Sequence, residues 1–208
     1  MRVIKLSFLI GLVVLVSCEN PAQLSEKELT EFVNDPANGV SKTIQAGKME
    51  MKVTLRPNDF LVYQEVGEEG SKEDIAEASK RYDDYLYLML SLSAGEKDAL
   101  YGLSQDQGVF SENLQVLSFR MGQYVTLTTS KQDTIPVGDY IFNRTFGLSK
   151  SNDLMFVFNR EKISEEGWVS FNIGEFGMST GRRNFRFELD DIYAVPTLEE
   201  LELLKGRK

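Results

Sequence analysis

The stretch "YLYLMLSLS", residues 85–93, carries the strongest structural signal in the chain. Leucine occupies every second position from 86 to 92, and the positions between them begin with Tyr85, Tyr87 and Met89. Alternate side chains of a strand point to opposite faces, so one face here is leucine and the other is also largely apolar. Such a strand is buried on both sides, which predicts a central strand of a sheet.

Strand patterns lie on both sides of this segment. Apolar and polar residues alternate from Met49 to Leu55, which predicts a hairpin of residues 40–45 and 48–56. With the later segments this gives about eight to nine strands, and it predicts a mainly β, α+β fold. We expect an antiparallel β-sandwich or a curved sheet with a few peripheral helices. The later strands are predicted near residues 114–121, 124–129, 138–144, 154–160, 168–173 and 184–189.

Helices are predicted at both ends of this sheet-rich region. Ser25 and Glu28 have the spacing of a capping box, which starts a helix over residues 26–34. Thr197 and Glu200 have the same spacing near the C-terminus and predict a short final helix. We therefore expect one domain, residues 24–208, with a helix at each end.

Composition excludes several classes of function. The formal net charge is −9, so nucleic acid is not an expected partner. Histidine is absent and there is one cysteine, which removes Ser-His-Asp and Cys-His catalysis and makes zinc or copper sites improbable. We expect no metal site, no cofactor and no catalytic residue.

The single cysteine follows an apolar run. Residues 1–17 begin "MRVIK" and continue with uncharged residues, which is the pattern of a signal peptide. Leu15, Val16, Ser17 and Cys18 match the lipobox of bacterial lipoproteins, in which the cysteine thiol receives the lipid. An ordinary secretory signal with a chance cysteine is the alternative. The pattern predicts a protein anchored to the membrane by lipid on Cys18.

The predicted anchor sets the layout of the mature chain. Removal of residues 1–17 takes away Arg2 and Lys5 and changes the formal net charge from −9 to −11. This charge opposes contact with anionic membrane surfaces, so residues 18–23 are expected to act as a short tether. We expect a location in the cell envelope, in the outer membrane, with its face unresolved.

Three regions contain candidate contact residues. The glycine-rich "GEFGMSTGRR", residues 174–183, ends in Arg182 and Arg183, which are candidates for binding a carboxylate or phosphate. It lacks the spacing of a phosphate-binding loop, and a turn between strands is the alternative. Trp168 lies on the more polar face of its strand, so it is either a platform for a sugar ring or a core residue.

Two further patterns are weaker. "FELDD" brings Glu188, Asp190 and Asp191 together, as a pair of carboxylates for hydrolysis or as solvated surface charge. "DTI", residues 133–135, resembles the O-glycosylation sequon of Bacteroidota, with Thr134 as the acceptor in a polar loop.

Longer stretches resemble a group of proteins. "DPANG" (residues 35–39), "RPND" (56–59), "LMFVFNRE" (154–161) and "GMSTGRRNFRFELDDI" (177–192) are similar to segments of small, uncharacterised Bacteroidota lipoproteins. The resemblance implies an envelope location and a β-rich domain. It does not indicate a particular biochemical activity.

Three hypotheses follow for function. The first is a noncatalytic envelope lipoprotein that binds another envelope protein or assists assembly. The second is an accessory lipoprotein that binds a glycan or small ligand through Trp168. The third is a hydrolase that uses Glu188, Asp190 or Asp191.

Overall fold

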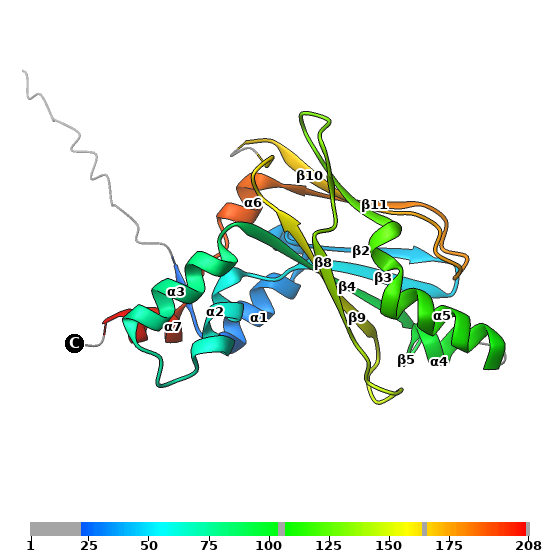
Figure 1. The fold of residues 1–208 in the computed structure, drawn as a ribbon, viewed down its shortest axis with the longest axis horizontal. Coiled ribbons are helices and arrows are strands. Elements are labelled where there is room, and N and C mark those ends of the chain that lie inside the picture. Colours follow the sequence, from blue (N-terminus) through cyan, green and yellow to red (C-terminus); the bar gives the residue numbers. More distant parts are fainter. Residues whose placement is uncertain (1–21, 104–106, 164–165, 207–208) are drawn as a thin grey trace, which may run out of the picture.

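The computed structural model describes residues 22–103, 107–163 and 166–206. Within these residues the fold is α+β, with two antiparallel sheets packed face to face and helices around them (Figure 1). This confirms the sheet-rich architecture with peripheral helices that the strand patterns predict. The signal peptide and Cys18 lie outside the described residues.

The larger sheet is built around the leucine-rich segment, which confirms its predicted central position. The predicted burial on both sides is wrong in part, because the leucine face is buried, whereas Tyr85, Met89 and Ser91 on the other face are partly exposed. Leu88 of this segment lies opposite Leu55 on one side and Phe156 on the other, and all three side chains are buried. Among the described residues this sheet has six strands. Their order is β2 (Ser41–Ala46), β3 (Met49–Leu55), β4 (Tyr85–Ala94), β9 (Asn152–Asn159) and β8 (Asp139–Asn143), with β5 (Lys97–Asp98) paired to the end of β4.

The smaller sheet supplies the other half of the core. One face of it is apolar and buried, and the opposite face carries partly exposed side chains such as Trp168 and Ser170. Its described strands follow the order β11 (Arg183–Glu188), β10 (Trp168–Ile173), β6 (Val125–Thr129) and β7 (Thr134–Pro136).

A layer of aromatic rings joins the two sheets. The ring of Phe171, in the smaller sheet, lies 5.4 Å from that of Phe156 and 6.1 Å from that of Phe158, both in the larger sheet. It also lies 6.3 Å from the ring of Phe185 on the neighbouring strand. All of these contacts are edge-to-face, the arrangement that aromatic pairs favour. The aromatic layer therefore sets the distance and orientation of one sheet against the other.

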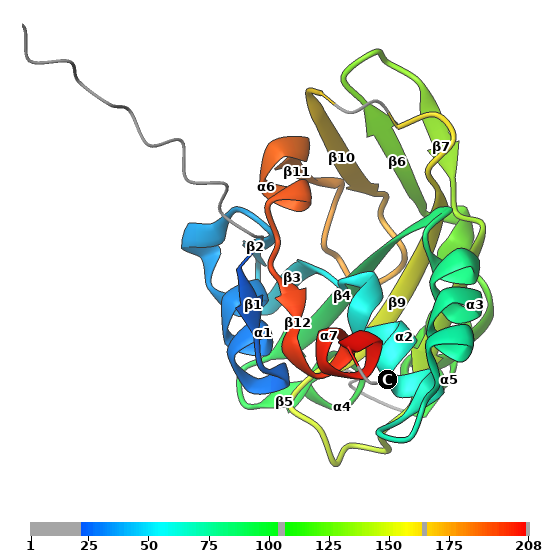
Figure 2. The same cartoon turned by 90° about the vertical axis from the view of Figure 1, so that its left-hand side faces the viewer.

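Four helices gather at one end of the larger sheet, and this end faces the viewer in Figure 2. The predicted capping box of the first helix is confirmed, because the Glu28 carboxylate accepts a hydrogen bond from the Ser25 backbone N–H at 3.1 Å. The helices are α1 (Glu26–Asn34), α2 (Asn58–Val66), α3 (Lys72–Tyr82) and α7 (Glu199–Gly206), and beside them β1 (Gln23–Leu24) pairs with β12 (Thr197–Leu198).

The strand predicted near residues 114–121 is wrong, because this segment belongs to a helix. Its neighbour Asn113 is buried together with Val116 and Leu117, which are three and four residues further on, and this is the spacing of a helix face. None of the described helices has both the length and the apolar content needed to cross a membrane. The remaining helices are α4 (Ala99–Leu103), α5 (Gln107–Phe119), α6 (Leu189–Tyr193) and the short 3₁₀ turns η1 (Pro36–Asn38) and η2 (Met121–Gln123).

The second predicted capping box is also wrong, although the final helix forms. The Thr197 hydroxyl is buried in β12 and has no hydrogen-bond partner in the described part of the chain. The Glu200 carboxylate instead accepts a hydrogen bond from the backbone N–H of Glu26, at 3.1 Å. Glu200 thus ties the start of α1 to α7, a contact between segments that are distant in sequence.

We expect replacement of Phe171 by alanine to lower the free energy of unfolding by about 3–5 kcal/mol, because the substitution leaves a cavity between the sheets. Urea unfolding of the full chain measures this loss. Phe119→Ala is the control, because that ring is 80% exposed and its removal should change stability by less than about 0.5 kcal/mol. Equal losses in the two variants would contradict the central place given to Phe171.

Candidate functional site

The loop between β8 and β9 ends in a tight turn with exposed apolar side chains. Leu148 donates its backbone N–H to the carbonyl of Thr145 at 3.0 Å, which closes a four-residue turn. Its central residues, Phe146 and Gly147, have φ of 54° and 78°, as in a type I′ turn. The Phe146 side chain is 65% exposed and that of Leu148 is 92% exposed.

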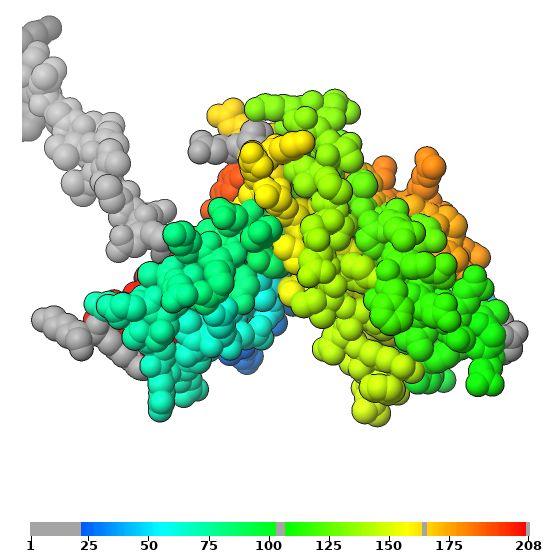
Figure 3. Space-filling model, viewed as in Figure 1, coloured from blue at the N-terminus to red at the C-terminus, as the bar shows by residue number. Residues whose placement is uncertain are grey.

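Cationic and aromatic side chains surround this turn. The Arg144 guanidinium lies 4.4 Å from the centre of the Phe146 ring. A side chain at Gly147 would begin 3.3 Å from the ring of Tyr101, so the turn lies against α4. Tyr101 in turn packs edge-to-face on Phe110 of α5, with ring centres 5.1 Å apart. We call these residues, Tyr101, Phe110, Arg144, Phe146 and Leu148, the tip surface; the hairpin that ends in it protrudes at the bottom of Figure 1 and of Figure 3.

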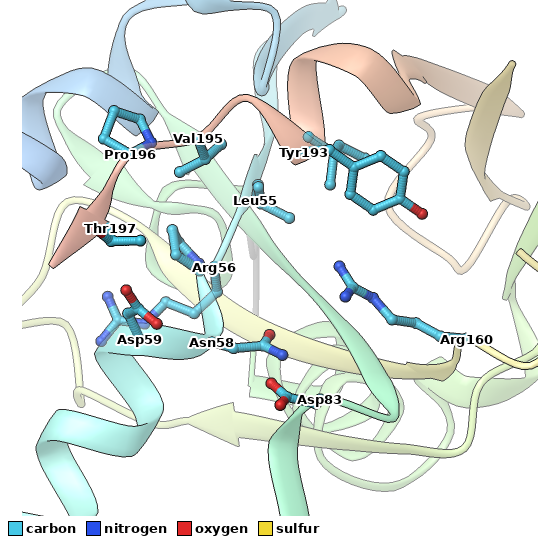
Figure 4. Close-up of a pocket in the computed structure, with 12 residues that line it drawn as sticks. Leu55, Arg56, Asn58, Asp59, Asp83, Arg160, Tyr193, Val195, Pro196 and Thr197 are labelled. Atoms are coloured by element: carbon cyan, nitrogen blue, oxygen red, sulfur yellow. The ribbon is translucent and has the colours of Figure 1, made fainter. Parts of the chain in front are cut away.

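A second feature is a pocket of about 230 Å³ between α2, the end of α3, the end of β9 and the segment after α6. Figure 4 shows Arg160 and Tyr193 on one side of it and Arg56 and Asp59 on the other, with Asn58 and Asp83 between them. The Tyr193 ring is about half exposed, and the Arg160 guanidinium lies 5.9 Å from its centre. We call this the charged pocket and define it by those six residues.

The charged pocket keeps opposite charges apart. In the described part of the chain, none of Arg56, Asp59, Asp83 and Arg160 forms an ion pair. Burial lowers the pKa of Arg56 below its ordinary value, and its guanidinium packs 4.4 Å above the Phe60 ring. The pocket therefore holds two cations and two carboxylates whose charges are not neutralised by direct partners.

Backbone contacts hold the walls of the charged pocket. Asp59 accepts a hydrogen bond from the Leu198 backbone N–H at 2.8 Å, which joins α2 to β12. Burial raises the pKa of Asp59, and the backbone hydrogen bond opposes this shift only in part. Asn58 donates from its side chain to the Tyr82 carbonyl at 3.0 Å, and the Arg160 backbone N–H bonds the Asp84 carbonyl at 2.9 Å. The charged side chains thus extend from fixed backbone.

The glycine-rich loop is closed by its own carboxylate. Glu175 accepts hydrogen bonds from the backbone N–H groups of Gly177 at 2.8 Å, Ser179 at 3.0 Å and Gly181 at 2.5 Å. Burial opposes ionisation of this carboxyl, but the backbone donors outweigh it and lower the pKa of Glu175. A loop of this shape can bind an external phosphate only if that position is vacant. The glycine-rich segment therefore fits the alternative interpretation, a turn between strands.

Arg182 and Arg183 are not brought together as a pair for binding an anion. Arg182 is exposed, whereas Arg183 is partly buried and donates to the Arg182 carbonyl at 2.9 Å. Trp168 is partly buried, and the Arg186 guanidinium lies 4.6 Å from its ring centre. This cation occupies one face of the ring, so Trp168 is not an open platform for a sugar.

The acidic cluster does not share one strand face. Glu188 ends β11 and its carboxylate bonds Arg186 at 2.9 Å, whereas Asp190 and Asp191 lie in the first turn of α6. Thr134 is exposed, but it lies in the edge strand β7 rather than in a loop, and its backbone pairs with Thr128. Within the described residues, no group of three or more acidic side chains is placed to hold a metal ion.

Sequence reasoning missed both the tip surface and the charged pocket. The tip had a signal, because "NRTFGLSK" (residues 143–150) places Phe-Gly where hairpin turns prefer Asn-Gly. The pocket had none, since its residues come from β3–α2, α3, β9 and the α6–β12 segment.

Comparison with known proteins adds little. No protein-family model and no curated protein sequence matches the chain. A crystal structure of a protein of unknown function from Burkholderia pseudomallei is similar with a TM-score of 0.38 at 8% identity, and the match covers 81% of this chain and 88% of that one.

Because Glu175 has a lowered pKa in the folded protein, its charge stabilises the fold above its ordinary pKa of 4.5, and this contribution is lost as the pH falls through the lowered value. We expect Glu175→Gln to cost about 1 kcal/mol at pH 7. The difference from wild type should shrink toward about pH 3. Urea unfolding across this range tests it against Glu112→Gln, an exposed control on α5. A cost independent of pH would contradict it.

Proposed function

We propose that this protein is a noncatalytic lipoprotein of the bacterial cell envelope that binds another envelope protein through the tip surface. The observation that carries the proposal is the exposure of Phe146 and Leu148 in a tight, hydrogen-bonded turn. Burial of such side chains in a partner is worth about 1.5–3 kcal/mol each. Large apolar anchors of this kind dominate binding energy at protein interfaces.

The backbone conformation of Phe146 in this turn is energetically unfavourable. A left-handed backbone at a residue other than glycine costs roughly 1–2 kcal/mol, and Phe146 is bulky and has this conformation. Its ring lies outside the core, so burial within the fold does not offset that cost. A strained residue with an exposed apolar side chain is typical of a contact site, because the partner supplies the missing contact.

Charge indicates the chemistry of the partner. The chain is acidic overall, yet the tip turn is flanked by Arg144 and Lys150. Lys150 pairs with Glu96 at 2.8 Å, but both side chains are more than 80% exposed, so the pair contributes little. Arg144 stacks on Phe146 instead of on a carboxylate. The partner surface that fits is an apolar groove with acidic residues at its rim.

The anchor part of the proposal rests on the sequence. The lipobox of residues 15–17 and Cys18 supports attachment. The predicted tether is one residue too long, because Gln23 belongs to β1, and residues 18–22 span at most about 3.5 Å per residue. The folded domain would then lie close to the membrane, where other envelope proteins are concentrated. The resemblance to Bacteroidota lipoproteins supports the outer membrane as the location.

We expect Phe146→Asn to separate folding from binding. Asparagine suits the left-handed conformation before Gly147, so the free energy of unfolding should stay equal or rise by up to about 1 kcal/mol. Crosslinking of the partner to the variant should nevertheless fall at least tenfold. Urea unfolding and crosslinking in native membranes measure the two effects. Phe119→Asn is the matched control, because it replaces another exposed phenylalanine outside the tip turn.

The partner is identified by crosslinking intact cells and comparing wild type with Phe146→Asn by mass spectrometry. A defined envelope protein that disappears with Phe146→Asn but stays with Phe119→Asn supports the proposal. A wild-type lipoprotein recovered as a monomer with no crosslinked protein contradicts it.

We expect Cys18→Ala to release the protein from the membrane, because the variant has no thiol for the lipid. Intact mass of wild type should match a chain that begins at Cys18 and carries acyl chains, and salt should not extract it. Fractionation of cells measures the distribution of both forms. A wild-type chain that begins at another residue or lacks lipid would overturn the anchor.

A further inference from the structure

The charged pocket contains a pattern that the tip surface does not use. It has two guanidinium groups and two carboxylates, and in the described residues none of the four is ion-paired. Opposite charges in one pocket attract each other. Here Arg56 contacts the Phe60 ring, Arg160 lies over the Tyr193 ring, and Asp59 accepts from the Leu198 backbone N–H instead.

The balance of charge decides which ligands fit. An ion with only negative charge would be attracted by Arg56 and Arg160 but repelled by Asp59 and Asp83. An ion with only positive charge would be attracted by the two carboxylates and repelled by the two guanidinium groups. A molecule that carries both charges satisfies both sets at once. The volume of about 230 Å³ suits a small molecule rather than a single water.

We propose that the charged pocket binds a small zwitterion, in which a phosphate or carboxylate lies a few bonds from an ammonium group. The guanidinium group of Arg160 binds the anionic end, because its planar donors match phosphate and carboxylate oxygens. Asp83 lines the same pocket and accepts from the ammonium group. Asn58 borders the space between the two ends (Figure 4).

The position of the pocket favours the headgroup of a phospholipid, phosphoethanolamine, as the source. The pocket wall includes Val195, Pro196 and Thr197, and the Thr197 backbone N–H bonds the Ala22 carbonyl at 3.1 Å. The pocket thus lies where the chain leads toward Cys18. The choice of source rests on the anchor proposed above, whereas the ligand chemistry does not. A free amino acid carries the same two charges and is the other source to test.

The test is calorimetric titration of the full chain in a nonionic detergent, which adds no competing charge. The probes are O-phosphoethanolamine and glycine as zwitterions, ethyl phosphate and acetate as anions, and ethanolamine as the cation. We expect at least one zwitterion to bind, and each of the single-charge probes to bind at least tenfold more weakly. Phosphoethanolamine alone identifies the lipid source, and glycine alone identifies the amino-acid source.

Variants locate the site. Arg160→Gln and Asp83→Asn should each weaken zwitterion binding at least tenfold, whereas Arg186→Gln and Asp133→Asn, at exposed positions outside the pocket, should not change it. Arg160→Gln should also remove any preference between zwitterion and ethanolamine. Unfolding curves show that the variants are folded.

Three outcomes would overturn the proposal: no binding of either zwitterion, equal binding of a single-charge probe, or binding unaffected by both pocket variants. These titrations use soluble probes and do not depend on Cys18 or on Phe146. Failure here therefore leaves the anchor and the tip surface untouched, and failure of either of those leaves the pocket untouched.

Discussion

The contact of Phe171 with Phe156 and Phe158 is the interaction on which the rest of the structure depends. It fixes the smaller sheet against β9, and β9 in turn pairs with β4 on one side and β8 on the other. The tip surface lies at one end of β8 and β9, and Arg160 follows the other end of β9. The β8–β9 hairpin therefore contributes to both features.

The tip turn and the glycine-rich loop differ in whether their own residues satisfy their backbone and side-chain groups. In the β10–β11 loop, Glu175 satisfies the backbone N–H groups that an external anion would need, so the loop is complete by itself. In the β8–β9 turn, Phe146 has an unfavourable backbone conformation and an exposed ring, so the turn is incomplete without a contact. The charged pocket resembles the turn, because its four charged side chains form no ion pair within the described residues. Unsatisfied groups, rather than motif-like residues, mark the candidate sites.

Several structural features follow from sequence because they depend on neighbours in the chain. The alternation of leucines identified β4, and the Ser25–Glu28 spacing identified the start of α1. The same reasoning failed where two patterns overlap: residues 114–121 read as a strand, but burial of Asn113, Val116 and Leu117 makes α5 a helix. The spacing of Thr197 and Glu200 was also misleading, since Glu200 bonds Glu26 in a distant segment. A prediction from a local pattern fails where a contact with a distant segment satisfies the same hydrogen-bonding group.

The sequence by itself determined the class of fold, the acidic character and the absence of histidine, and it predicts the lipid anchor at Cys18. These properties depend on composition and on residues that are adjacent or a few positions apart. Only the tertiary structure decided that Trp168 is covered by Arg186, and that Arg56, Asp83 and Arg160 surround one pocket. The reason is physical: burial and charge separation depend on segments that come into contact only after the sheets have packed. Residue spacing along the chain does not predict such contacts.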